Sequence, residues 1–196
     1  MMLWLNLTLC PLPVTAQSAG VEVGAHLGIL RLSELDTTDV GVGTHVVVPL
    51  ASVVAVDATL TWFPGVDDLE ANVANSQDRV LGMAGLRATV PSGNVEVFAR
   101  GSAGFLRLMP QRSVVCIAVF PPPLGCRLAT GYTAFTSRFG GGASVGLRSN
   151  GQLRVHIEAG DLLVRYGLEA VRPNGEITDG FVDHNLLVSI GLGWRF

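Results

Sequence analysis

Hydrophobic and polar residues alternate along most of this chain, and a period of two is typical of β-strands. The pattern is clearest over residues 182–196, where large apolar side chains fall on one face and small or polar side chains on the other. The apolar face holds Leu186, Val188, Ile190, Leu192, Trp194 and Phe196, and the opposite face holds Asn185, Leu187, Ser189, Gly191, Gly193 and Arg195. A strand with lipid outside and a polar lumen inside fits this distribution better than the closing strand of a soluble barrel, which is the alternative.

Seven earlier segments show the same alternation. They cover residues 20–30, 40–48, 54–62, 79–90, 95–106, 132–148 and 153–166. In the last of these the parity shifts near Gly160 and Asp161, so we expect a β-bulge there, with Val164 and Tyr166 pointing outward beyond it. With the C-terminal segment, the pattern predicts eight strands.

The connections between these segments alternate between long and short. Short turns are predicted around Pro49, at 91–94 and at 149–152, where Asn150-Gly151 is a strong hairpin signal. Long loops are predicted at 31–39, 64–78, 107–131 and 167–181. All long loops therefore lie at one rim of an antiparallel up-and-down β-barrel, as in outer-membrane barrels with short periplasmic turns and long extracellular loops.

Aromatic residues near the strand ends agree with interfacial girdles. Trp62, Phe105, Tyr132, Tyr166 and Phe181 lie toward the long-loop rim, and Trp194 and Phe196 lie toward the other.

Composition supports an all-β chain whose apolar residues are spread out. The 196 residues are 48% hydrophobic and 15% charged, with 24 glycines and a mean hydropathy of +0.44. After the N-terminus, no apolar run approaches the roughly 18 residues of a membrane helix. The net charge of −3 gives no general attraction to nucleic acid.

Residues 1–16 have the features of a signal peptide, which leaves residues 17–196 as one barrel domain. The first twelve residues are mostly apolar, and Val14 and Ala16 supply the small residues expected before a cleavage site. The basic n-region is missing. A lipoprotein signal at Cys10 is a weaker alternative, because the bulky Leu9 precedes that cysteine.

Once a leader is removed, Cys116 and Cys126 remain as an even pair. They flank the Pro121–Pro123 reversal in the third long loop, so a disulfide between them would close a hairpin there. Metal binding by this pair is disfavoured, since no histidine or further cysteine lies nearby.

The terminal Leu192-Gly193-Trp194-Arg195-Phe196, preceded by hydrophobic residues at every second position, resembles the last strand of OmpA-like small outer-membrane β-barrels. The resemblance covers residues 20–196. It implies that Ile190, Leu192, Trp194 and Phe196 form a signal read by the barrel assembly machinery. Some members of the family also carry a periplasmic peptidoglycan-binding domain. Because this sequence stops at its last strand, we expect that activity to be absent.

Charges of both signs fall on the predicted inner face, where an unpaired charge would be costly. They are Glu22, Asp57, Arg87, Glu96, Arg100, Arg138, Arg148, Arg154, His156, Glu158 and Arg195. Eight strands enclose a space that side chains can fill. We therefore expect a plug of charge pairs, and a small-solute pore is the alternative.

Catalysis is not expected. Enzymes of the lipid A deacylase family are also small barrels, and they carry a His-x-Ser pair for catalysis. This sequence lacks such a pair. Its histidines, His26, His45, His156 and His184, are followed at the second position by Gly28, Val47, Glu158 and Leu186. We expect no catalytic residue, no cofactor and no metal.

The sequence thus predicts a monomeric, integral outer-membrane protein of a Gram-negative-type bacterium, in contact with outer-membrane lipid and lipopolysaccharide. Its expected role is structural or at the cell surface, with loop 107–131 as a candidate surface for binding or adhesion. Besides a pore, the alternatives are a lipid A-modifying enzyme and a soluble lipocalin-like carrier. A carrier would turn its apolar faces inward and its charges outward.

Overall fold

The computed structural model describes residues 20–33, 37–65, 78–109, 131–147, 152–167, 170–171, 177–178 and 180–196. The predicted signal peptide, the Cys116–Cys126 disulfide and Arg148 lie outside these residues. Within the described ranges there is no helix long and apolar enough to cross a membrane.

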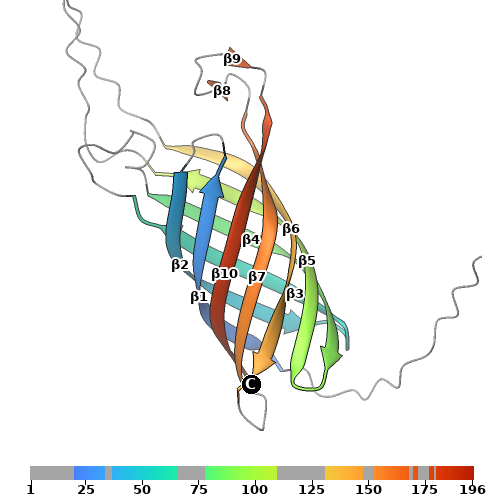
Figure 1. The fold of residues 1–196 in the computed structure, drawn as a ribbon. Helices are drawn as coiled ribbons and strands as arrows, with labels where there is room; N and C mark the ends of the chain where they lie inside the picture. The colour runs from blue at the N-terminus through green and yellow to red at the C-terminus, as the bar shows by residue number, and fades with distance from the viewer. Residues whose placement is uncertain are drawn as a thin grey trace, which may run out of the picture.

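The chain forms a closed antiparallel barrel of eight strands (Figure 1). Its strands are β1 (Glu22–Leu32), β2 (Thr37–Pro49), β3 (Val54–Phe63), β4 (Arg79–Ser92), β5 (Val95–Leu108), β6 (Tyr132–Gly146), β7 (Leu153–Arg165) and β10 (Val182–Arg195). Each strand pairs with its neighbours along the chain, and β10 closes the wall by pairing with β1. Two short strands, β8 (Ala170–Val171) and β9 (Ile177–Thr178), form a separate small sheet. The predicted fold class is confirmed.

The strands are staggered around the wall, as closure of a tilted sheet requires. We start at Glu22 on β1 and move from each residue to its partner on the next strand around the wall. The residues met in this way are Val47, Asp57, Gly85, Ser102, Arg138, Leu162 and Asn185. Asn185 on β10 is next to Leu186, whose partner on β1 is Arg31. One circuit of the wall therefore starts at one end of β1 and returns near its other end. This stagger brings residues from distant parts of the sequence to one level of the lumen.

The outer surface is apolar and the interior holds the charges. This is the sidedness that the alternation predicts. Leu60 and Ile190 are each 52% exposed, whereas Arg100 and Arg154 are each 5% exposed. Large hydrophobic residues are also exposed on each of the other barrel strands, including Val23, Val42, Leu86, Val97, Phe139 and Ile157.

The two rims differ. One carries the C-terminus and the hairpin between β4 and β5, and the other carries β8 and β9 (Figure 1). The hairpin has only Gly93 and Asn94 between its strands, and Gly93 has a positive φ of 63°. The Asn94 side-chain amide also donates a 2.5 Å hydrogen bond to the carbonyl oxygen of Gly146, which ties the hairpin to β6.

The predicted loop at 31–39 is mostly strand. β1 and β2 pair as far as Leu32 and Thr37, so the connection is confined to residues 33–36. The β-branched Thr37 and Thr38 suit a strand. Asp39 is tied inside the wall by an ion pair with Arg79. The polar composition of this segment therefore predicted a loop, whereas the segment is strand and its Asp39 has a partner within the barrel.

The predicted bulge in the seventh segment is wrong. β7 pairs without interruption with both β6 and β10, so Asp161 points outward and the fully buried Val164 points inward. Tyr166 packs partly buried against the interior hydrophobic cluster. In a barrel with a polar interior throughout, an apolar Val164 and Tyr166 would indicate a change of face, but the interior at this level is apolar.

The lumen near the β8–β9 rim is in fact filled by hydrophobic side chains. They come from all of the barrel strands except β2 and comprise Leu30, Leu32, Phe63, Leu81, Met83, Leu106, Ala134, Leu162, Val164 and Leu187. This apolar layer was missed because single inward leucines do not stand out in an alternating strand.

Candidate functional site in the barrel lumen

The structure places the predicted charges that it describes on the inner face. Glu22, Asp57, Arg87, Arg100, Arg138, Arg154, His156 and Glu158 are buried, and Glu96 and Arg195 are partly buried. The alternation of each strand aims these side chains inward, and the stagger determines which of them meet. They form two groups of ion pairs, one above the other along the lumen.

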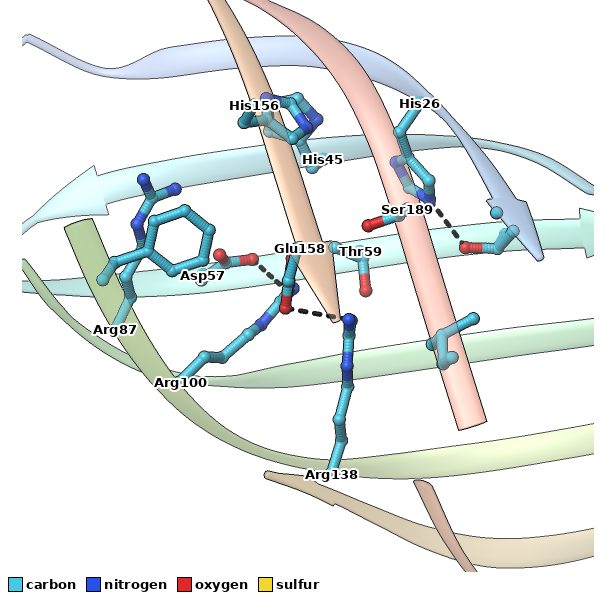
Figure 2. Close-up of a pocket in the computed structure, with 14 residues that line it drawn as sticks. His26, His45, Asp57, Thr59, Arg87, Arg100, Arg138, His156, Glu158 and Ser189 are labelled. Carbon is cyan, nitrogen blue, oxygen red and sulfur yellow. Dashed lines mark hydrogen bonds and ion pairs between the residues drawn. The ribbon is translucent and has the colours of Figure 1, made fainter. Parts of the chain in front are cut away.

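The central group is built around Arg100 on β5. Its Nη1 lies 2.9 Å from both carboxylate oxygens of Glu158 on β7, and its Nη2 lies 2.5 Å from Oδ1 of Asp57 on β3. Nη2 of Arg138 on β6 lies 2.9 Å from Glu158 Oε1. Four strands are thus connected across the lumen, as Figure 2 shows.

The second group lies near the rim that carries the C-terminus. Nη2 of Arg195 lies 3.1 Å from Oε2 of Glu22, and its Nη1 lies 3.1 Å from Oε1 of Glu96. Nη2 of Arg154 is 3.3 Å from Glu96 Oε2, and its Nε donates a 2.8 Å hydrogen bond to Ser144 Oγ. Buried carboxylates in this group therefore face cations.

Arg87 has a different kind of partner. Its guanidinium carbon lies 3.7 Å from the centroid of the Phe98 ring, in a cation–π contact. Phe98 is a buried aromatic residue on the inner face. The contact shows that this face is not uniformly polar even at the level of the charges.

Three histidines also meet in the lumen, although the charge network predicted from the sequence includes only His156. The ring centroids of His45 and His156 are 4.4 Å apart, and those of His26 and His45 are 6.1 Å apart. His26 Nε2 and Thr61 Oγ1 form a 2.9 Å hydrogen bond. The inward parity of His26 and His45 was visible in the sequence, but their proximity to His156 depends on barrel closure.

A small cavity lies between the histidines and the central ion pairs (Figure 2). It offers about 20 Å³ to the centre of a water molecule, which is enough for one or two waters. Asp57, Arg100, Glu158, Thr59 and Ser189 are among its lining residues. On the side of the long loops, Leu187 borders both this cavity and the apolar layer.

The residues of the predicted assembly signal lie on the outer side of β10. Ile190, Leu192 and Phe196 are exposed, and Trp194 is partly exposed. Their role in assembly remains a prediction.

No protein-family model and no curated protein matches the sequence of this chain. Solved structures similar to this chain include Ail of Yersinia pestis in complex with the heparin analogue sucrose octasulfate. That pair is 12% identical, with a TM-score of 0.49, over 91% of this chain and 97% of Ail.

Two further similar structures are the N-terminal β-barrel domain of OprF from Pseudomonas aeruginosa and the neisserial surface protein NspA. For OprF the identity is 12% and the TM-score 0.47, over 89% of this chain and 97% of that domain. For NspA the identity is 14% and the TM-score 0.48, over 90% of this chain and 96% of that protein. At these identities the likeness is one of fold.

Proposed function

We propose that this chain is an integral outer-membrane β-barrel protein of a Gram-negative-type bacterium, with a structural or surface role. One observation carries the proposal: apolar side chains cover the outside of a closed barrel whose interior holds paired charges. An apolar surface that encircles a protein is unfavourable in water but suits the hydrocarbon of a bilayer. Closure leaves no unpaired strand edge, which favours a monomer.

The same sidedness opposes a soluble lipocalin-like carrier. A carrier needs an apolar cavity for its ligand, whereas the cavity in this lumen is lined by charged and polar residues such as Asp57, Arg100 and Glu158. Its outer surface would have to be polar, yet Leu27, Leu60 and Ile190 are exposed there.

We infer that the lumen is sealed and does not conduct solutes. Two kinds of barrier lie in series: the ion pairs around Arg100 and Arg195, and the apolar layer near the β8–β9 rim. Hydrated ions would have to break the buried pairs and then cross a layer in which Leu30 and Leu162 are fully buried.

Three outward arginines support contact with anionic lipid headgroups, including lipopolysaccharide. Arg31, Arg107 and Arg165 are exposed near the ends of β1, β5 and β7, next to the rim that carries β8 and β9. Each follows the last outward apolar residue of its strand. A guanidinium at that height can pair with the phosphates of a lipid headgroup.

The surface part of the proposal concerns the loops. The predicted loop 107–131, of which β5 takes the first two residues and of which 110–130 lie outside the described residues, contains Val114, Val115, Ile117, Val119 and Phe120. This set is unusually apolar for a loop predicted to lie at the surface. We propose this loop as the surface for binding or adhesion. Cleavage of the loop by protease added to intact cells would support surface exposure, and cleavage only after cell lysis would oppose it.

Fractionation followed by gel migration tests the membrane proposal. The protein should be recovered in outer membranes, and unheated samples should migrate differently from boiled ones, because a folded barrel resists detergent. Recovery in the soluble periplasm with unchanged mobility on boiling would favour the carrier.

Recording from planar bilayers tests the seal. The purified protein should give no steady conductance, and stable open channels would overturn the inference.

Incubation with lipopolysaccharide tests the enzyme alternative, since release of acyl chains would show lipid A hydrolysis.

A further inference from the structure

We propose that Glu22, His45 and His156 form a site for a divalent transition-metal ion of the zinc class, inside the lumen. The three side chains come from β1, β2 and β7 and are only 1%, 5% and 6% exposed. One ligand atom from each lies within 4.8 Å of the other two. Two imidazoles and one carboxylate are a donor set that binds zinc in proteins.

Apart from the 3.5 Å contact between Glu22 Oε1 and His45 Nε2, the ligand atoms of the site have few partners. Among the described residues, none forms a hydrogen bond to Oε1 of Glu22, to either ring nitrogen of His45 or to Nδ1 of His156. Buried polar atoms are nearly always hydrogen-bonded, so several unpartnered atoms at one point require an explanation. A bound cation would satisfy lone pairs from all three residues.

The spacing of the first two ligands already suits one ion. Glu22 Oε1 and His45 Nε2 are 3.5 Å apart. Two ligands at zinc bond lengths in a tetrahedral arrangement would be about 3.4 Å apart. The ligand atom of His156 lies within 4.8 Å of the other two, so the His156 side chain has to move closer to bind the same ion.

Glycines on the neighbouring wall make room for these three side chains. A Cβ built on Gly193 would lie 2.6 Å from Glu22 Oε1, and one built on Gly191 would collide with the His156 ring. The inward glycines of β10 therefore leave space for the proposed ligands.

The charges around the site permit a cation. Glu22 uses Oε2 to hold Arg195, which leaves Oε1 facing His45, and Arg195 is balanced in turn by Glu96. Arg87 is a further cation near the site, and its guanidinium lies over Phe98. The side chains of Arg195 and Glu96 are 30% and 16% exposed, so the C-terminal rim is the more open side of the site, and an entering ion would have to displace the Arg195–Glu96 pair.

Zinc titration of the folded barrel in detergent, with a chromophoric chelator as competitor, tests the site. We expect one tight zinc per chain. Glu22→Gln, His45→Gln and His156→Gln should each weaken binding by about 10- to 100-fold or more, because even residues that only support ligands have effects of that size. His184→Gln is the matched control, since His184 pairs with Asp161 on the outer surface. It should bind like wild type.

Two measurements on the wild-type protein do not depend on the variants. Cobalt should give the visible absorption of a four- or five-coordinate ion, and zinc X-ray absorption should show two imidazoles and oxygen ligands.

Heat-modifiable migration would verify that each variant is folded. Absence of stoichiometric zinc binding by the wild type, or equal binding by all folded lumen variants, would overturn the proposal. The titration uses purified barrels, so its outcome is independent of where the protein resides in the cell.

Discussion

Arg100 and Glu158 form a forked contact at the centre of the barrel, with one guanidinium nitrogen 2.9 Å from both carboxylate oxygens. Each residue has a further partner, Asp57 for Arg100 and Arg138 for Glu158. The pair therefore joins these two ion pairs into a chain that crosses the lumen, and loss of Arg100 would leave two carboxylates without their shared cation.

Arg100→Met should lower the free energy of unfolding by about 3–5 kcal/mol, because it strands buried charges. Urea titration of the barrel in lipid vesicles would measure the change. Arg107→Met removes an exposed arginine from the outer side of the same strand, where only an exposed headgroup contact is lost, and should change the free energy by no more than about 1 kcal/mol. Equal losses in both variants would contradict a central role for the Arg100 pairs.

Leu162→Ala should cost more stability than Leu186→Ala. Leu162 is fully buried in the apolar layer, so its truncation leaves a cavity and should cost about 3–5 kcal/mol. Leu186 faces outward, where lipid replaces the missing atoms, so only the transfer contribution of about 2 kcal/mol is lost. The same urea titration compares them, and the opposite ranking would show that the apolar layer is loosely packed.

Ile190→Arg tests the lipid-facing surface. An arginine on the outer face near the bilayer midplane should cost about 2–4 kcal/mol and reduce the folded, heat-modifiable fraction. Leu50→Arg places the same charge on the exposed connection between β2 and β3 and should leave folding unchanged. If Ile190→Arg folded as well as wild type in bilayers, contact between this face and hydrocarbon would be refuted.

Gly93→Val should destabilise the β4–β5 hairpin by about 1–2 kcal/mol, because its positive φ is unfavourable for a side chain. A Cβ at this position meets no atom within 4 Å, so the effect would be purely conformational. Gly93→Asn should be tolerated, since asparagine visits this conformation more readily. Unfolding by urea distinguishes the two variants, and an equal cost for both would point to another cause.

The Cys116–Cys126 disulfide remains a prediction from the sequence. Mass spectrometry of a proteolytic digest without reductant should recover one cross-linked peptide containing both residues. Two free thiols in protein taken from the outer membrane would exclude the bond.

The alternation predicted the strands and the direction of most side chains, because a period of two is a local property of the chain. It placed Glu22, Arg100 and Glu158 inside and Leu60 and Ile190 outside before any partner was known. The first loop and the proposed bulge were misjudged for one common reason. Polar residues were assumed to indicate loops or lumen, and apolar residues were assumed to indicate lipid.

The sequence by itself thus determined that this chain forms strands with one apolar and one polar face, because side-chain direction depends only on neighbouring residues. The tertiary structure decided which inward residues meet. Barrel closure and stagger brought Arg100 between Asp57 and Glu158, and His45 beside Glu22 and His156. It also decided that leucines fill the lumen beyond them. These contacts join strands far apart along the chain, so no local pattern specifies them.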